Sequence, residues 1–118
     1  MDKSSLKISI ITVCFNASNT IEETIISVVK QTYKNIEYII IDGGSSDQTN
    51  NIIDKYSEFI SYYCSEPDDG IYDAMNKGLE YVTGDYVLFL GADDHLISYS
   101  VIEQVCNKYC YIIEVKSF

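Results

Sequence analysis

Four short apolar runs alternate with segments whose apolar residues recur at helical spacing, and this alternation constrains the fold more than any other feature. The runs cover residues 7–14, 36–41, 59–64 and 86–90. A run that is apolar almost throughout predicts a strand buried on both faces. Strands that alternate with helices across short loops predict right-handed βαβ crossovers. We therefore expect an α/β fold, with a doubly wound, mainly parallel sheet and helices on both faces.

Four segments between and after these runs are predicted to be helical. The first begins at a capping box formed by Asn19 and Glu22 and ends at residues 31–33. The others cover residues 47–56, 71–82 and 100–109. We expect Gly84 to stop the third helix and residues 111–115 to add a short strand. The 118 residues are the length of one domain.

Polar residues follow the predicted strands, and the carboxyl ends of parallel strands share one edge, where open α/β sheets bind ligands. These residues are Asn16, Asp42, Glu66, Asp68, Asp93 and Asp94, with Phe15 beside the first. Asp42 before two glycines can also be a turn former, and Asp93-Asp94 a helix cap. His95 can be a metal ligand or an exposed residue, and we favour exposure.

Carboxylates that converge at one edge repel each other unless a cation lies between them. A divalent metal ion resolves this repulsion, and hard oxygen ligands indicate Mg²⁺ or Mn²⁺, which complete their shells with water and phosphate oxygens. The pattern therefore suggests a nucleoside diphosphate held through its metal. A P-loop is excluded because GxxxxGK[ST] does not occur, and the turn VCFNAS lacks the glycines of a dinucleotide fingerprint.

The charge balance excludes several classes of partner. Eight lysines and no arginine stand against eighteen Asp and Glu, for a net charge of −10. A phosphate-tracking surface needs the opposite sign, so we expect no nucleic-acid partner. Without arginine, an anionic ligand must be held by backbone N–H groups, helix N-termini, lysine or a metal.

Cysteine usage and hydropathy indicate a cytoplasmic protein. No apolar run approaches the ~20 residues of a membrane span, and the first residues do not resemble a signal peptide. The four cysteines have no framework spacing, which favours reduced thiols. Cys106 and Cys110 lie four residues apart, and we interpret them as packing residues rather than a zinc site.

Three stretches of the sequence resemble a known family. They are ISIITVCFN, QTYKNIEYIIIDGGSSDQT and SEPDDGIYDAMNKGLEYVTGDYVLFLGADD. Over roughly residues 7–98, they are similar to the family 2 glycosyltransferases, inverting enzymes of the GT-A fold. The subgroup they resemble occurs in bacterial polysaccharide and lipopolysaccharide assembly. The resemblance implies that the chain is the Rossmann-like, nucleotide-sugar-binding half of a GT-A fold.

The resemblance implies a role for each matched position. The positions implied to bind the nucleotide are Thr12, Val13, Phe15, Asn16, Asp42, Gly43, Asp73 and Asn76. The first four would form the lip of the first strand, the next two the base-binding turn, and the last two the cover of the nucleotide. Asp93 matches the metal-ligating aspartate of a DxD-type motif, with Asp94 as a second carboxylate for Mg²⁺ or Mn²⁺. The metal would bridge the two phosphates.

The implied donor is a UDP- or GDP-sugar and the implied acceptor a glycan or a lipid-linked glycan, at a cytoplasmic site that includes the inner face of the membrane. Gly43 and Gly91 stand where many members have acidic residues. Nothing after Asp94 resembles the acceptor-binding half, so we expect the general base beyond residue 118 and a donor-binding domain truncated after the metal motif. The alternatives are a binding module without turnover and a structural remnant that forms a homodimer through its exposed C-terminal region.

Overall fold

The computed structural model describes residues 6–109 and contains one four-stranded sheet. Its strands are β1 (Ile8–Cys14), β2 (Ile36–Asp42), β3 (Tyr62–Ser65) and β4 (Tyr86–Phe89). Its helices are α1 (Ile21–Val29), α2 (Thr49–Asp54), α3 (Ile71–Leu79) and α4 (Val101–Tyr109), with a 3₁₀ turn η2 (Ser57–Phe59). The strand order is β3-β2-β1-β4, and every neighbouring pair is parallel. The predicted doubly wound α/β architecture is confirmed.

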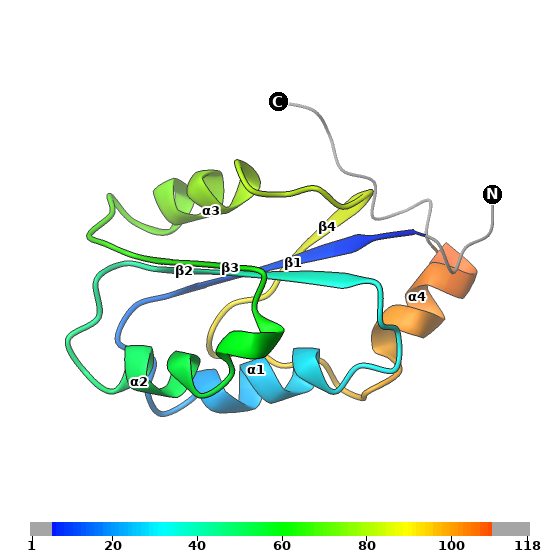
Figure 1. Ribbon diagram of the computed structural model, residues 1–118, viewed down its shortest axis with the longest axis horizontal. Coiled ribbons are helices and arrows are strands. Elements are labelled where there is room, and N and C mark those ends of the chain that lie inside the picture. The colour runs from blue at the N-terminus through cyan, green and yellow to red at the C-terminus, as the bar shows by residue number, and fades with distance from the viewer. Residues whose placement is uncertain (1–5, 110–118) are drawn as a thin grey trace.

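The sheet separates two apolar layers, with α3 on one face and α1 and α2 on the other (Figure 1). Ile8 and Ile10 of β1 belong to the larger core cluster, which also includes Ile21, Ile25 and Val28 of α1 and Ile53 of α2. Ile11 belongs to a second cluster together with Ala74 of α3. Successive strand side chains point to opposite faces. Because both faces are covered by helices, both sets of β1 side chains must be apolar, which explains the unbroken apolar run.

The register brings the carboxyl ends of three strands into one row. Cys14 of β1 lies opposite Asp42 of β2, and Asp42 lies opposite Ser65 of β3. In β4 the last residue, Phe89, lies opposite Ile11, so this strand ends nearer the middle of β1. The loops that follow the four strands therefore form one edge of the sheet, at the left of Figure 1.

The predicted capping box at the start of α1 is not formed. The N-cap residue is Thr20, and it makes no side-chain capping bond. The carboxylate of Glu22 accepts instead from the Tyr56 hydroxyl at 2.7 Å and pairs with Lys55 at 3.1 Å. The prediction was wrong because partners from the segment after α2 take the carboxylate that the local motif would use.

Several element boundaries differ from the prediction for local reasons. Helix α2 begins at Thr49 because the Asp47 carboxylate, outside the helix, accepts from the Thr49 amide at 2.9 Å. After α3, the amides of residues 80–82 bond three residues back, so the helical spacing of apolar side chains continues past Leu79. Residues 57–59 form η2 rather than part of β3. The strand predicted at residues 111–115 lies outside the described residues.

Two glycines allow the α3 layer to approach the sheet closely. A Cβ on Gly78 would lie 2.8 Å from Cγ2 of Ile11, so α3 packs directly against β1. A Cβ on Gly84 would lie 2.4 Å from Oγ of Ser9 and 2.8 Å from the carbonyl oxygen of Lys7. Gly84 follows the third helix, as predicted, and its lack of a side chain lets the chain pass against β1 before β4 begins.

Candidate functional site

A pocket of about 380 Å³ opens at the carboxyl edge of the sheet. Its walls come from the ends of β1 and β2, the loop after β3 and the beginning of α3. The lining residues are Val13, Cys14, Phe15, Gly43, Asp68, Gly70, Ile71 and Ala74. Phe15 and Ile71 are 63% and 60% exposed. A cavity of this size with apolar walls is typical of small-molecule and cofactor sites.

Three of the predicted nucleotide-binding residues, Val13, Phe15 and Gly43, line this pocket. Thr12 does not, because its neighbour Val13 points to the α3 face and Thr12 points the other way. The Thr12 side chain is buried, and its hydroxyl shares a 2.8 Å hydrogen bond with the hydroxyl of Tyr38.

Asn16 connects the turn after β1 to the turn after β2. Its amide N–H donates to Oγ of Ser45 at 2.7 Å, and its side-chain oxygen accepts from the amide of Ser46 at 2.8 Å. Its φ of 48° lies in the left-handed region, which asparagine tolerates better than most residues. Asn16 therefore fixes the relative position of two loops at the site.

Asp42 is fully buried and is surrounded by hydrogen-bond donors. Its Oδ2 accepts from the Gly44 amide at 3.1 Å, the Ser45 amide at 2.8 Å and the Ser65 hydroxyl at 2.8 Å. Its Oδ1 accepts from the Ser45 hydroxyl and from the Cys14 thiol at 3.3 Å. Burial by itself would raise the pKa of Asp42, but these donors outweigh it and hold the pKa below its ordinary value.

The thiol of Cys14 stays protonated in this arrangement. Burial raises its pKa far above the ordinary value, and the nearby charge of Asp42 raises it further. Cys14 therefore acts as a small hydrogen-bond donor to the carboxylate of Asp42. Cys106 is buried, consistent with its predicted packing role, and Cys110 lies outside the described residues. Cys64 is half-buried.

Asp68, one of the polar residues predicted at this edge of the sheet, lines the pocket, although the resemblance did not imply a nucleotide contact for it. Its Oδ1 accepts from the Gly70 amide at 3.1 Å. A Cβ on Gly43 would lie 3.0 and 3.2 Å from its two carboxylate oxygens. The carboxylate thus lies over Gly43, in space that a side chain at position 43 would occupy. The sequence signal was the loop SEPDDG opposite an Asp-Gly-Gly turn, but their proximity was not readable from either motif alone.

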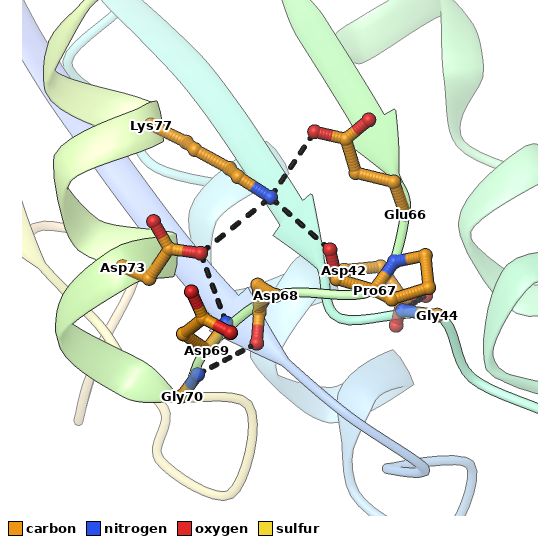
Figure 2. A network of polar contacts seen from close by, with 9 residues as sticks. All are labelled: Asp42, Gly44, Glu66, Pro67, Asp68, Asp69, Gly70, Asp73 and Lys77. Carbon is orange, nitrogen blue, oxygen red and sulfur yellow. Dashed lines mark hydrogen bonds and ion pairs between the residues drawn. The ribbon is translucent and has the colours of Figure 1, made fainter.

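Lys77 holds the loop after β3 against α3 (Figure 2). Its Nζ lies 3.1 Å from Glu66 and 3.8 Å from Asp73, and it donates to the carbonyl oxygen of Pro67 at 3.4 Å. Hydrogen bonding to Glu66 raises the pKa of Lys77. Asp73 also accepts from the Asp69 amide at 2.9 Å. Asp73 therefore orders the loop beside the pocket.

Asn76, the other residue predicted on α3, is exposed and is not part of the pocket wall. Ile71 and Ala74 of the same helix do line the pocket. They lie three residues apart on one face, and their spacing alone could not distinguish a pocket wall from ordinary core packing.

Asp93 and Asp94 are exposed in the loop that follows β4. Oδ1 of Asp93 and Oδ2 of Asp94 lie on the same side of Gly91. They are 3.2 and 3.3 Å from the position that a Cβ on Gly91 would occupy. Within residues 6–109, no donor or cation contacts either carboxylate. Two exposed, unpaired carboxylates on one side of a loop fit a hard divalent ion that takes its other ligands from water and phosphate. No three His, Cys, Asp or Glu side chains in the described part of the chain come together as a metal site.

Three buried polar side chains hold the loop that carries these aspartates: Thr24 and Ser27 of α1, and Gln31 just after it. Thr24 donates to the carbonyl oxygens of Ala92, at 3.0 Å, and of Asp94. Ser27 accepts from the Leu96 amide at 3.1 Å, and Gln31 donates to the Ser98 carbonyl at 2.7 Å. These anchors recur every three or four residues, a helical spacing that polar residues on a solvated helix face also have.

His95 is exposed, as predicted, with Nδ1 3.6 Å from the carboxylate of Glu23. Between residues 6 and 109, no helix combines the length and the apolar character needed to cross a membrane.

Comparison with known proteins identifies the family. The model of the family described as Glycosyl transferase family 2 matches residues 9–110. An uncharacterized glycosyltransferase of Mycobacterium tuberculosis is 39% identical over 98 residues, which are 82% of this chain. The chain spans only 37% of the length of that relative.

Solved structures with the same architecture include two complexes. S. aureus TarS in complex with UDP-GlcNAc matches 86% of this chain and 30% of its own, with a TM-score of 0.77 and 26% identity. Glucosyl-3-phosphoglycerate synthase from Mycobacterium tuberculosis, in complex with Mn²⁺, UDP and phosphoglyceric acid, matches 79% of this chain and 36% of its own. The TM-score is 0.66 and the identity 25%. The parallel sheet is thus the sheet of a GT-A fold. By its sequence match over most of its length and by its architecture, this chain belongs to glycosyltransferase family 2.

Proposed function

We propose that this chain is the donor-binding part of a glycosyltransferase that uses a UDP- or GDP-sugar. The sugar is transferred with inversion to a glycan or lipid-linked acceptor in cell-surface polysaccharide synthesis. The observation that carries the proposal is the arrangement of one sheet edge, where an apolar-walled pocket and the unpaired carboxylates of Asp93 and Asp94 occur together. The UDP-GlcNAc bound to TarS and the Mn²⁺ and UDP bound to the phosphoglycerate synthase support it.

Each part of the edge has a separate task in this proposal. Val13, Phe15 and Ile71 provide apolar walls that exclude water from one face of the nucleoside. Asp42 and Asn16 order the two turns beneath it through their hydrogen bonds. Asp93 and Asp94 would hold Mg²⁺ or Mn²⁺. When bound, such an ion neutralises the charge that develops on the departing nucleoside diphosphate.

We further propose that the donor site works in the cytoplasm, at the inner face of the membrane, and that the general base lies beyond residue 118. Both statements rest on the family resemblance. The same resemblance leaves a binding module without turnover as the alternative. Metal-dependent nucleotide binding with no sugar transfer to any supplied acceptor would identify that alternative.

The test is calorimetric titration of UDP and of GDP into the 118-residue chain, with and without Mn²⁺. We expect binding of at least one nucleotide that strengthens tenfold or more with Mn²⁺. Asp93→Ala should remove the gain from Mn²⁺ without lowering the melting temperature, because its side chain is exposed and makes no hydrogen bond or ion pair within the described residues. Asp54→Ala, another exposed aspartate, on α2, is the matched control and should keep the gain. A folded chain that binds neither nucleotide would contradict the proposal and leave the chain as a structural remnant.

A further inference from the structure

The side chains around the pocket present a hydrogen-bond acceptor and hardly any free donor. Asp68 is the one charged residue among the eight that line it, and the others are apolar residues, glycines and Cys14. The thiol proton of Cys14 is already donated to Asp42. The amides of Gly43, Gly70 and Ala74 are also occupied, by Cys14, Asp68 and Gly70 respectively. Among the described side chains of the lining, the hydrogen-bonding groups open to a ligand are therefore the acceptor oxygens of Asp68.

The carboxylate of Asp68 is held in one place from two sides. The Gly70 amide bonds it at 3.1 Å, and Gly43 leaves room for it, because a Cβ there would lie 3.0 Å from Oδ2. The two loops that meet here also approach closely, since a Cβ on Gly44 would lie 3.2 Å from the backbone nitrogen of Pro67. Gly44 has a φ of 90°, so another residue at this position would be strained.

The contacts of Lys77 fasten the same loop from the side of α3. Its ammonium group binds Glu66 and the carbonyl oxygen of Pro67, the two residues directly before Asp68 (Figure 2). Asp73 holds the amide of Asp69, the residue directly after it. With its neighbours fixed on both sides, Asp68 is preorganised, and a ligand need not supply the ordering free energy on binding.

We propose that Asp68 reads the base of the nucleotide and that the pocket prefers guanine. The inference rests on the proposed donor site. An ionised carboxylate has only acceptors, and its two oxygens bind two parallel N–H donors best. Guanine presents N1–H beside its 2-amino group, so both oxygens can accept. Uracil presents one N–H between two carbonyl oxygens, so one carboxylate oxygen can accept from it while the other faces a carbonyl oxygen.

The test compares diphosphates that differ only in the base, titrated into the 118-residue chain with Mn²⁺. We expect GDP to bind at least tenfold more tightly than UDP, a difference of about 1.4 kcal/mol, because guanine donates one more hydrogen bond to the charged carboxylate than uracil does. Inosine diphosphate lacks the 2-amino group and should bind severalfold more weakly than GDP. This comparison uses the unaltered protein, so it does not depend on any variant folding.

Asp68→Asn supplies a second, independent readout. The amide offers one donor and one acceptor, so the variant should lose tenfold or more in GDP affinity and gain affinity for xanthosine diphosphate, which has a carbonyl where guanine has the amino group. Asp69→Asn is the matched control. It makes the same charge change one residue away, at an exposed side chain outside the pocket wall, and should leave all base preferences unchanged.

Each outcome decides between the two proposals. UDP binding as tightly as GDP, or Asp68→Asn retaining the parent's preferences, overturns the role of Asp68 and leaves the donor site standing. A folded chain that binds no diphosphate overturns both. Preference for GDP together with the change to xanthosine diphosphate in Asp68→Asn supports both.

Discussion

Asp42 combines two properties that rarely occur together, full burial and a lowered pKa. Its carboxylate is the point where β1, β2 and β3 end, because the register places Cys14 and Ser65 on either side of it. The turn-former interpretation of Asp42 accounts for its hydrogen bonds to Gly44 and Ser45, whereas Cys14 and Ser65 bind the carboxylate from the neighbouring strands. Its implied contact with the base stays a prediction, since its side chain faces protein donors rather than the pocket.

Replacing Asp42 by Asn should destabilise the protein at neutral pH. The amide nitrogen would face N–H and O–H donors that now have an acceptor, at a cost of about 2–3 kcal/mol in the free energy of unfolding. The folded-state pKa of Asp42 is below the ordinary 3.8, so its stabilisation is present above that pH and is lost as the pH falls below it. Urea unfolding should show that the variant has a much lower free energy of unfolding than the parent at pH 7. The difference between the two should be smaller at pH 3.

The control for Asp42→Asn is Asp54→Asn, at an exposed position on α2. It should change the free energy of unfolding by no more than about 0.5 kcal/mol at either pH. If Asp42→Asn lowers the free energy of unfolding equally at both pH values, the charge of Asp42 is not the cause of the loss, and the charge-based explanation is contradicted.

At the scale of elements, α1 does more than cover the sheet. Its apolar side, with Ile21, Ile25 and Val28, packs into the larger core cluster, as the sequence spacing predicts. The buried hydroxyls of Thr24 and Ser27 reach instead to the loop after β4, some seventy residues later in the chain. The helix therefore positions the two aspartates proposed to bind the metal.

Thr24→Val should loosen that loop while keeping the volume of the side chain nearly constant. The change leaves the carbonyl oxygens of Ala92 and Asp94 without their buried donor, at a cost of about 1–2 kcal/mol in the free energy of unfolding. We expect the Mn²⁺-dependent part of nucleotide affinity to fall severalfold and the metal-free part to stay unchanged. Calorimetry with and without Mn²⁺ separates the two.

Thr20→Val, one turn earlier at the exposed start of α1, makes the same chemical change where the hydroxyl has only a 3.5 Å contact with a local carbonyl oxygen. It should leave the gain from Mn²⁺ intact. Equal losses in metal-dependent and metal-free binding for Thr24→Val would mean that α1 supports the whole site rather than this loop.

At the scale of the whole molecule, the net charge of −10 is carried by a small body with a radius of gyration of 13.7 Å. The Debye length at 0.1 M salt is about 10 Å, which is comparable to that size. Repulsion among the carboxylates is therefore felt across much of the molecule at low ionic strength and is screened at moderate ionic strength.

Raising NaCl from 20 mM to 300 mM at pH 7 should increase the melting temperature by a few degrees, because screening weakens this repulsion. The check is thermal unfolding followed by circular dichroism. KCl at equal ionic strength should give the same increase, since screening does not depend on the identity of the ion. A melting temperature that falls with salt would show that exposed ion pairs such as Lys77–Glu66 outweigh the repulsion.

The homodimer expected through the C-terminal region remains a prediction, because residues 110–118 lie outside the described part of the chain. The edge strand β4 pairs with β1 on one side, and Phe89, Ile97 and Tyr99 are exposed near it or in the segment that follows.

The sequence by itself determined the order and type of the elements, the parallel sheet and the polar residues that follow each strand. Apolar runs and helical spacing are local properties, and the crossover rule converts their order into one topology. For the same reason, the family motifs could be recognised without coordinates.

Only the tertiary structure decided which of those residues face the pocket. Val13 lines it and Thr12 does not, because that depends on which face of β1 receives α3. Asp68 reaches over Gly43 because two loops 25 residues apart in the chain meet in space. Such contacts join residues that are distant in sequence, and no local pattern records the distance between them.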